Sequence, residues 1–254
     1  MLLIDGKIYE SQELPTIYFG RNRPLSYVLN PKAACTLALN FVFYVNHNYR
    51  YFDHFRIHGS ELALLKLRGP ELDAQALSIY YRLSPKSFTI VRDPLQRFVS
   101  AFLGKIFTDD DPDYYLPRDY LTSVYDIDLS PEADPAQSCL AFAKWLAMQP
   151  DPRQFDRHFK PQYLNLMVDS RFTVDTILRL EDRDALLAFF TRWIGAEKAK
   201  WFLSFRFNEQ TKYKSDEVIT DELEDIVRKI YARDYELFYP RLRSRAATQA
   251  RATG

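Results

Sequence analysis

The hydrophobic pattern alternates between short apolar runs and longer amphipathic segments. Residues 25–29 (Leu-Ser-Tyr-Val-Leu) predict a buried strand, and a helix over 34–45 follows the break at Asn30-Pro31. A second buried strand is predicted up to Val91, and apolar side chains at every fourth residue beyond it predict a helix with a wide apolar face (Phe98, Phe102, Ile106). Strands that alternate with helices predict an α/β fold, with a mostly parallel central sheet flanked by helices.

The remaining pattern predicts further elements of both kinds. Less regular ones are expected over 1–23 (a hairpin or irregular arm), 50–57 (strand), 61–67 and 74–83 (short helices) and 109–117 (an acidic surface loop or lid). Clearer ones are expected over 135–148, 183–194, 196–204 and 221–238 (helices) and 172–180 (a strand ending at Arg179). Because no repeat or linker interrupts the pattern, we expect one domain over 1–242 and a disordered polar tail over 243–254.

Composition narrows the function classes. The chain has 254 residues, and its 34 Lys+Arg balance its 34 Asp+Glu, so nothing global predicts a nucleic-acid or membrane-surface partner. Only two cysteines occur, which excludes a disulfide framework or a cysteine metal cluster and favours a reducing, cytoplasmic setting. No long apolar run predicts a signal peptide or a transmembrane segment. The sequence sets no expectation for the oligomeric state.

Two segments that join a predicted strand to a predicted helix carry the residues of an anion site. Residues 30–36 (Asn-Pro-Lys-Ala-Ala-Cys-Thr) follow the first strand, while Arg92 ends the second and Ser100 lies on the next helix. Backbone N–H groups at a helix start bind phosphate, especially beside a cation and a hydroxyl. The first loop is not a Walker A sequence, because it contains no glycine. Two such loops at adjacent strand ends predict a ligand with phosphates at both ends.

These motifs resemble those of sulfotransferases that use 3′-phosphoadenosine 5′-phosphosulfate (PAPS). They are most similar to the carbohydrate group that includes the Golgi chondroitin and dermatan sulfotransferases and, more distantly, heparan 2-O-sulfotransferase. The matching blocks occur in order between about residues 25 and 240: Pro31-Lys32-x-x-x-Thr36, Arg92-Asp93-Pro94-x-x-Arg97-x-x-Ser100, His158-Phe159-Lys160-Pro161-Gln162, residues 177–182, and Tyr231, Asp234, Tyr235, Leu237 and Phe238. Unlike the Golgi relatives, the chain has no membrane anchor and no cysteines just after Pro161-Gln162, which suits a soluble bacterial-type member.

The resemblance implies a P-loop-like sulfotransferase fold and PAPS as co-substrate, with no metal. It implies that the first loop binds the 5′-phosphosulfate, with Lys32 as the catalytic cation (Pro31, Lys32, Ala33, Ala34, Cys35, Thr36). The segment from Arg92 to Ser100 would bind the 3′-phosphate, and a loop that folds over the nucleotide would add Lys212 and Lys214. At a helix start the pKa of the Cys35 thiol is expected to fall, although we interpret this residue as packing.

The base that deprotonates the acceptor hydroxyl is expected to be a histidine, whose pKa lies near neutral pH. His58 matches the region where heparan 2-O-sulfotransferase carries its catalytic histidine and is the first candidate. His158 is the alternative, as base or as an acceptor contact. Arg157, Lys160 and Gln162 are further candidates for acceptor contacts. The cluster of Arg153, Arg157, Lys160 and Arg171 would suit a sulfated or carboxylated glycan, although a solvated face is the commoner explanation of such a charge run.

The sequence therefore predicts a cytoplasmic enzyme that sulfates a hydroxyl of a carbohydrate, glycolipid or other glycoconjugate. Two alternatives stay open. A P-loop-type kinase for a small molecule is disfavoured by the missing Gly-Lys-[Ser/Thr]. A non-catalytic nucleotide-binding protein on the same scaffold is disfavoured by the intact Lys32, Arg92 and Ser100.

Overall fold

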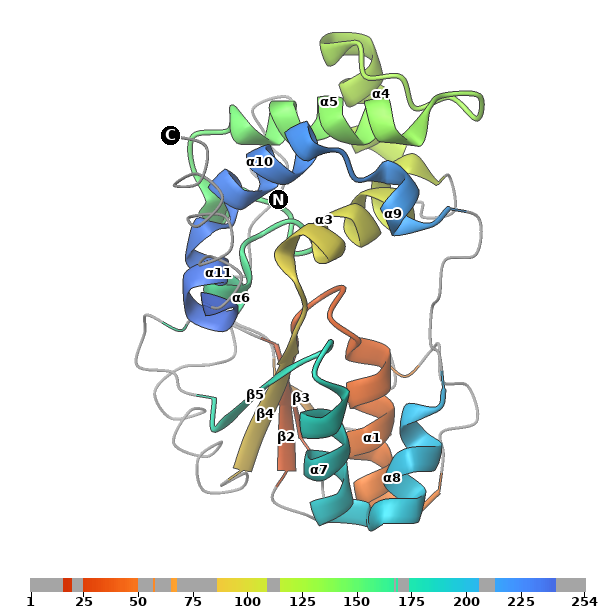
Figure 1. The fold of residues 1–254 in the computed structure, drawn as a ribbon, viewed down its shortest axis with the longest axis vertical. Helices are drawn as coiled ribbons and strands as arrows, with labels where there is room; N and C mark the ends of the chain where they lie inside the picture. Colours follow the sequence, from red (N-terminus) through yellow and green to blue (C-terminus); the bar gives the residue numbers. More distant parts are fainter. Residues whose placement is uncertain are drawn as a thin grey trace, which may run out of the picture. The chain divides into compact units, whose positions relative to one another are not determined.

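The computed structural model describes residues 16–19, 25–49, 57, 65–67, 86–108, 115–166, 168, 174–205 and 213–240. They fall into two compact units, drawn in Figure 1. The sheet unit comprises residues 12–92 and 162–209, and the helical unit comprises residues 1–11, 93–161 and 210–254. The single domain expected over 1–242 stays a prediction, and the tail over 243–254 lies outside the described residues.

The sheet unit is built on one sheet whose described strands are β1 (Ile17–Phe19), β2 (Leu25–Val28), β3 (Leu65–Leu67), β4 (Lys86–Val91) and β5 (Thr176–Arg179). Their order across the sheet is β3-β1-β2-β4-β5. The pairs β2–β4 and β4–β5 are parallel, whereas β1 is antiparallel to both of its neighbours, β2 and β3. Four of the five described strands therefore point the same way, which confirms the α/β class with a mostly parallel sheet.

The central strands match the sequence prediction and the outer ones do not. Residues 25–29 and the stretch up to Val91 form β2 and β4, and the strand expected over 172–180 is shortened to β5. The prediction of a helix over 61–67 is wrong for its last three residues. Leu65–Leu67 forms strand β3, which pairs with Ile17–Phe19. The irregular arm expected over 1–23 contains the strand β1. In both cases a three-residue strand owes its conformation to its sheet partners, which local propensity does not reveal.

Three helices of the sheet unit pack against the apolar side chains of β2, β4 and β5, namely α1 (Cys35–His47), α7 (Arg183–Ile194) and α8 (Ala196–Leu203) (Figure 1). Helix α1 is buried along its whole length from Thr36 to Val45, as its continuous apolar sequence predicts. Phe41 of α1 stacks on Phe190 of α7, with ring centroids 3.8 Å apart. A one-turn helix, α6 (Gln162–Asn165), completes the described helices of this unit. The predicted helices over 34–45, 183–194 and 196–204 are confirmed.

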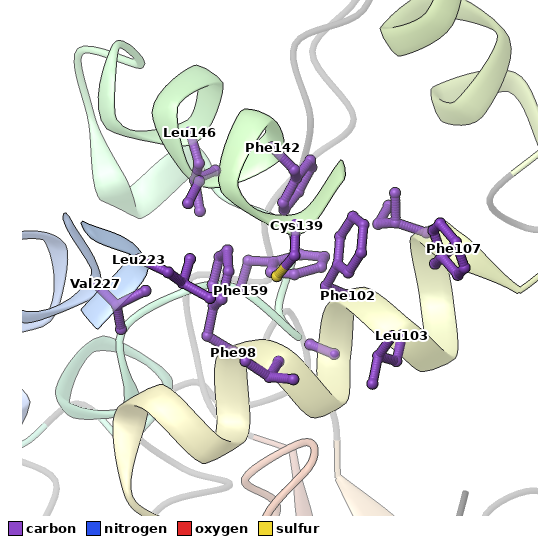
Figure 2. Close-up of a cluster of buried hydrophobic side chains, with 14 of the residues drawn as sticks. Phe98, Phe102, Leu103, Phe107, Cys139, Phe142, Leu146, Phe159, Leu223 and Val227 are labelled. Carbon is purple, nitrogen blue, oxygen red and sulfur yellow. The ribbon is translucent and has the colours of Figure 1, made fainter. Parts of the chain in front are cut away.

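The described part of the helical unit consists of α3 (Pro94–Phe102), the π-helical turn η3 (Leu103–Phe107), α4 (Tyr115–Tyr125), α5 (Pro135–Ala147), the 3₁₀ turn η5 (Pro152–Gln154), α9 (Ser215–Val218), α10 (Asp221–Ile230) and α11 (Ala232–Phe238). Its core is a cluster of aromatic and aliphatic side chains shown in Figure 2. Phe98 and Phe102 of α3 meet Phe142 of α5, with ring centroids 5.9 and 5.6 Å apart. Phe159, from the loop before α6, packs 4.9 Å from Phe142 and so ties that loop to the core.

Helix predictions for this unit hold with two corrections. The helices after Arg92 and over 135–148 are confirmed as α3 and α5. The single helix expected over 221–238 is interrupted at Tyr231, which separates α10 from α11. The predicted loop over 109–117 extends too far along the chain, because helix α4 begins at Tyr115. The helix contains Pro117 near its start, where proline is tolerated. The helix expected over 74–83 lies outside the described residues, as does the strand expected over 50–57 except for its last residue, Ile57, which is not in a strand.

Candidate active site

The loop between β2 and α1 has the backbone of an anion cradle although it holds no glycine. Lys32 and Ala34 both adopt the left-handed conformation, with φ of 64° and 55°. Each non-glycine residue in that region costs about 1 kcal/mol, and such strain gathers at functional sites. Ala33 between them is not left-handed, so the sign of φ alternates along the loop. The Ala33 N–H donates to the Asn30 carbonyl at 3.3 Å, and an alternation of this kind is typical of backbone nests that bind anions.

The start of α1 strengthens this cradle. Its N-cap, Ala34, makes no side-chain hydrogen bond to the helix, so no side-chain oxygen of the cap competes with an incoming anion. The backbone N–H groups of Lys32, Cys35 and Thr36 act on the Cys35 thiol, as does the Lys32 charge, and each favours the thiolate. Burial outweighs them, so the pKa of Cys35 is raised. The expected fall of the pKa of Cys35 is therefore wrong. Its side chain stays a protonated thiol that packs within the cradle.

The cradle is joined to the end of β4 by a buried amide. Gln162 is fully buried, and its Oε1 accepts from Asn30 Nδ2 at 2.8 Å and from the Arg92 backbone N–H at 3.0 Å. Its Nε2 donates to the Arg92 carbonyl at 2.8 Å. Asn30 Nδ2 also donates to the Ile90 carbonyl at 3.0 Å. Gln162 thus acts as a brace between the loops that follow β2 and β4, and the acceptor contact expected of it stays a prediction.

The guanidinium of Arg92 lies against the backbone of the loop that carries Lys32. Because β2 and β4 are parallel neighbours, the segments that leave their carboxyl ends are adjacent. Arg92 Nη1 donates to the Lys32 carbonyl at 3.4 Å, across 60 positions of sequence. The guanidinium and the cradle therefore belong to one electropositive edge of the sheet. This confirms that the loops after the two strands lie side by side.

In the helical unit, the start of α3 is already occupied by its own cap. Asp93 Oδ1 accepts from the Gln96 N–H at 3.0 Å, and Pro94 takes the first helical position, as the sequence predicts. The backbone at this helix start is therefore less open to an anion than that of α1. Ser100 lies half-buried two turns along α3.

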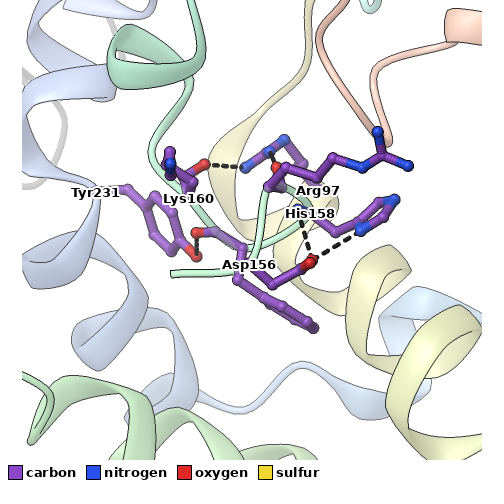
Figure 3. A network of polar contacts seen from close by, with 7 residues as sticks. Arg97, Asp156, His158, Lys160 and Tyr231 are labelled. Carbon is purple, nitrogen blue, oxygen red and sulfur yellow. Dashed lines mark hydrogen bonds and ion pairs between the residues drawn. The ribbon is translucent and has the colours of Figure 1, made fainter. Parts of the chain in front are cut away.

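Arg97, the second arginine of the Arg-Asp-Pro-x-x-Arg motif, is a structural residue. Its side chain is 1% exposed, and its Nη1 and Nη2 donate to the carbonyls of Lys160 and Arg157, each at 3.0 Å. The resemblance had implied that the motif as a whole binds phosphate. The burial of Arg97 instead commits its guanidinium to the loop that carries His158 (Figure 3).

Tyr231 holds the same loop from the other end of the chain. Its hydroxyl donates to the Phe159 carbonyl at 2.6 Å, and its side chain is 1% exposed. Burial raises the pKa of this phenol, which therefore stays protonated as a donor. The carbonyls of residues 157, 159 and 160 thus all accept from buried side chains. Three such hydrogen bonds within four residues fix the backbone of the loop that carries His158.

On this loop His158 is paired with Asp156. His158 Nδ1 lies 2.7 Å from Asp156 Oδ1, and the His158 backbone N–H donates to the same oxygen at 2.9 Å. Burial would raise the pKa of Asp156, but the charge and hydrogen bonds of His158 hold it below its usual value. Burial lowers the pKa of His158, and Asp156 opposes that shift without reversing it. The histidine is therefore neutral at pH 7, beside an ionised carboxylate.

The other predicted site residues are placed as follows. Arg157 is exposed, Lys160 is 6% exposed, and Lys214 is exposed at the start of α9. The predicted base His58 and the predicted phosphate contact Lys212 lie outside the described residues. The acceptor-binding roles of His158, Arg157 and Lys160 stay predictions.

Asp156 was missed by the sequence interpretation, although a signal for it exists. An aspartate two residues before a histidine can cap the local turn through the backbone N–H of that histidine, as it does here. The brace role of Gln162 had no such local signal, because its partners are 70 and 132 positions away.

Two further properties concern metals and membranes. In the part of the chain that the structure describes, His, Cys, Asp and Glu side chains form no group of three suited to a metal ion. None of the helices among the described residues is long and apolar enough to span a bilayer.

Comparison with known proteins agrees with this geometry. The model of the sulfotransferase family matches residues 16–240, nearly the whole chain. The chain therefore belongs to the sulfotransferase family, whose members are enzymes that use PAPS as sulfuryl donor. No curated protein and no solved structure matched the chain in the other two comparisons.

Proposed function

We propose that the enzyme moves the sulfuryl group of PAPS to a hydroxyl of a carbohydrate or glycoconjugate acceptor. The observation that carries the donor half of this proposal is the strained, glycine-free cradle at Lys32–Ala34, with the Arg92 guanidinium bonded to its first carbonyl. Strain of about 1 kcal/mol at each of two residues persists only where the surroundings impose it. A dianionic phosphosulfate is the family ligand that such a cradle suits.

The residues of the proposed donor site are assigned to two different anionic groups of PAPS. In this proposal the cradle and the Lys32 ammonium hold the 5′-phosphosulfate, while Arg92 and Ser100 hold the 3′-phosphate, as the motif resemblance implies. Exposed Lys214, together with Lys212, adds positive charge for the nucleotide phosphates. Sulfuryl transfer is an in-line displacement in which negative charge grows on the leaving phosphate oxygen. Lys32 stabilises that charge, which is the largest electrostatic contribution this loop offers.

The acceptor half of the proposal rests on the resemblance to carbohydrate sulfotransferases and on charge. Arg153 and Arg157 are exposed on either side of Asp156, where they favour an anionic glycan over an apolar phenol. We also propose a cytoplasmic setting, because Cys35 and Cys139 are both free thiols.

Donor binding is tested by calorimetry with 3′-phosphoadenosine 5′-phosphate (PAP), the product nucleotide, against ATP–Mg²⁺. We expect PAP to bind at least about tenfold more tightly, and Lys32→Ala and Arg92→Ala each to weaken PAP by about tenfold to a hundredfold, since each removes a charge-assisted contact. Lys86→Ala, an exposed lysine at the start of β4, is the matched control and should leave the affinity unchanged. Tighter binding of ATP–Mg²⁺ would favour a kinase and overturn the donor assignment.

The acceptor is tested with ³⁵S-labelled PAPS and a panel of polysaccharides, glycolipids, small glycosides, phenols and tyrosine peptides. Label in the carbohydrate fraction is the expected result, lost in Lys32→Ala. Label confined to phenols or tyrosine peptides would contradict the carbohydrate assignment while leaving the donor intact.

A further inference from the structure

Two exposed aromatic side chains of the sheet unit meet at the end of α1. Tyr49 is 60% exposed, and Trp201 of α8 keeps 43% of its surface exposed. Both lie against the last turns of α1, which runs beside α8 in Figure 1. Because α1 has 13 residues and rises about 1.5 Å per residue, this end lies about 18 Å from the helix start beside the cradle. The exposed rings are therefore separate from the proposed donor site.

The two rings are held in place by aromatic neighbours. Tyr49 lies edge-on to Phe43, with ring centroids 5.4 Å apart. Trp201 lies edge-on to Phe205 at 4.8 Å, and its ring centroid is 6.3 Å from that of Tyr44. A ring that is packed on one side and exposed on another loses little side-chain entropy when a partner covers it. The exposed parts of Tyr49 and Trp201 are thus preorganised for contact.

Cations surround these rings, although the chain as a whole has no net charge. The structure describes all of residues 43–49 and 192–205, and the acidic and basic side chains in them, apart from that of His47, are exposed: Arg192, Glu197, Lys198 and Lys200. Three of these four are cationic. Lys198 precedes Trp201 by three residues and therefore shares its face of α8. Its Nζ lies 5.9 Å from the centre of the Tyr44 ring, so charge and rings occupy one surface.

The uncharged polar side chains beside the rings are bonded within the chain. Asn48 Oδ1 accepts from Lys198 Nζ at 3.5 Å, and Ser204 Oγ donates to the Trp201 carbonyl at 2.6 Å. A sugar or peptide site depends on convergent polar groups that fix hydroxyls or amides. Exposed rings among cations are instead typical of membrane interfaces, where rings enter the headgroup region and lysine heads stay in water. The composition therefore favours a lipid surface.

We propose that the end of α1 and the outer face of α8 form a docking surface for an anionic lipid bilayer. Tyr49 and Trp201 enter the headgroup region, while Arg192, Lys198 and Lys200 lie close to the lipid phosphates. Each cation near such a bilayer adds about fivefold to the affinity, and the Glu197 carboxylate opposes them. The inference does not depend on the sulfuryl chemistry, because none of these residues belongs to the proposed donor or acceptor site.

Binding is tested by co-sedimentation of the whole chain with vesicles of phosphatidylcholine, either pure or containing about 30% phosphatidylserine. At about 0.1 M salt we expect binding to the anionic vesicles to be at least about tenfold tighter than to the neutral ones. Raising the salt to about 0.5 M should release the protein, because the lysine charges are then screened. Equal binding to both kinds of vesicle, or none to the anionic kind, overturns the proposal.

Two variants place the contact on this surface. Lys198→Ala combined with Lys200→Ala should weaken binding to the anionic vesicles by about tenfold or more, because two cations are removed. Tyr49→Ser should weaken it by about threefold to tenfold, because an exposed ring no longer enters the headgroup region. Both substitutions alter exposed side chains, so the fold should be retained, which circular dichroism checks.

Matched controls come from the helical unit. Lys144→Ala combined with Lys229→Ala removes two exposed lysines, and Met148→Ser removes an exposed apolar side chain. Both controls should bind the anionic vesicles as the wild type does. Equal weakening by the two lysine pairs would show a diffuse charge effect and overturn the assignment of the surface.

Trp201 provides a spectroscopic signature of the docked state. It is the most exposed of the three tryptophans, since Trp145 is buried and Trp193 is partly buried. We expect tryptophan emission to shift to the blue when anionic vesicles are added, and Trp201→Phe to abolish that shift. A shift that persists in Trp201→Phe overturns the placement of this ring in the bilayer.

Other occupants of the surface give different outcomes. Tighter binding to dextran sulfate than to anionic vesicles, lost in the Lys198 and Lys200 variant, would assign the surface to an anionic polysaccharide. A dimer in sedimentation velocity that dissociates in Tyr49→Ser, without vesicle binding, would assign it to a second copy of the chain. Either result overturns the lipid assignment. A wild-type chain that transfers no sulfate overturns only the proposed function.

Discussion

Asn30 and Gln162 stand 132 positions apart in the chain, yet their amides share a hydrogen bond of 2.8 Å in a fully buried position. The same Gln162 oxygen accepts from the Arg92 N–H, and its nitrogen donates to the Arg92 carbonyl. One side chain therefore sets the spacing of the two loops that carry Lys32 and Arg92. The distance between the two groups proposed to bind phosphate is thus controlled from a third segment.

A double-mutant cycle measures this coupling. We expect Asn30→Ala and Gln162→Ala to be non-additive by about 1 kcal/mol or more in the free energy of unfolding in urea, because they share a buried hydrogen bond. PAP affinity should fall in both single variants. Asn46→Ala, whose Nδ2 donates within α1 to the Val42 carbonyl at 2.7 Å, should combine additively with Gln162→Ala. Additivity for both pairs would contradict the brace.

The strained cradle makes opposite predictions for two alanines one helical turn apart. Ala34→Gly should leave the free energy of unfolding unchanged or raise it by up to about 1 kcal/mol, because glycine has no penalty at a φ of 55°. Ala38→Gly, within α1, should lower it by about 1 kcal/mol or more. Urea unfolding monitored by circular dichroism checks both. Equal destabilisation by the two substitutions would argue against a strained backbone at Ala34.

The two arginines of the Arg-Asp-Pro-x-x-Arg motif should differ in what they control. Arg97→Lys cannot bond both carbonyls, so we expect a loss of about 2–4 kcal/mol in the free energy of unfolding, with little change in PAP affinity measured on the folded protein. Arg92→Lys should show the reverse. Arg233→Lys, whose surface pair with Glu236 spans 3.4 Å, is the control and should change stability by less than about 0.5 kcal/mol. A strong loss of PAP affinity in Arg97→Lys without loss of stability would restore the phosphate role.

The His158 environment predicts how the pH profile moves. A histidine base works when it is neutral, and burial lowers the pKa of His158, so on the predicted role of His158 as base the acid limb of kcat/KM should lie below about pH 6.5. Asp156 favours the charged ring, so Asp156→Asn should shift that limb to lower pH while reducing the maximum. Lys105 disfavours the charged ring, so Lys105→Met should shift the limb to higher pH.

Lys144→Met is the control for that experiment, since Lys144 is exposed on α5 and paired with Glu222 at 2.7 Å. Its pH profile should match that of the wild type. A profile that is insensitive to both Asp156→Asn and Lys105→Met would show that another group titrates.

Elements with strong local patterns could be predicted from the sequence. Helix α1 is apolar on all sides, α3 opens with an aspartate cap and a proline, and β4 is a continuous apolar run. Each of these signals lies within the element itself, so neighbouring segments do not alter it. The same holds for the loop over residues 30–36, whose place between a strand and a helix is a local property.

What escaped prediction depends on partners far away in the chain. Leu65–Leu67 becomes a strand because Ile17–Phe19 pairs with it, and the long helix is interrupted at Tyr231, whose hydroxyl bonds Phe159. The structural use of Arg97 and Gln162 likewise depends on backbone groups more than 60 positions away. A motif records that such residues occur together, but only the fold shows which of them face a ligand and which hold the others in place.

The sequence neighbour of Asn30 has a chemical consequence over time. The common route by which an asparagine side chain ages begins when the backbone nitrogen of the next residue loses its proton and attacks the side-chain carbonyl. Asn30 is followed by Pro31, whose nitrogen carries no proton, so that cyclisation is closed. Spontaneous conversion to aspartate would place a negative charge against the Ile90 carbonyl and the Gln162 oxygen. The amide that spaces the loops of Lys32 and Arg92 is therefore protected from deamidation through a cyclic imide.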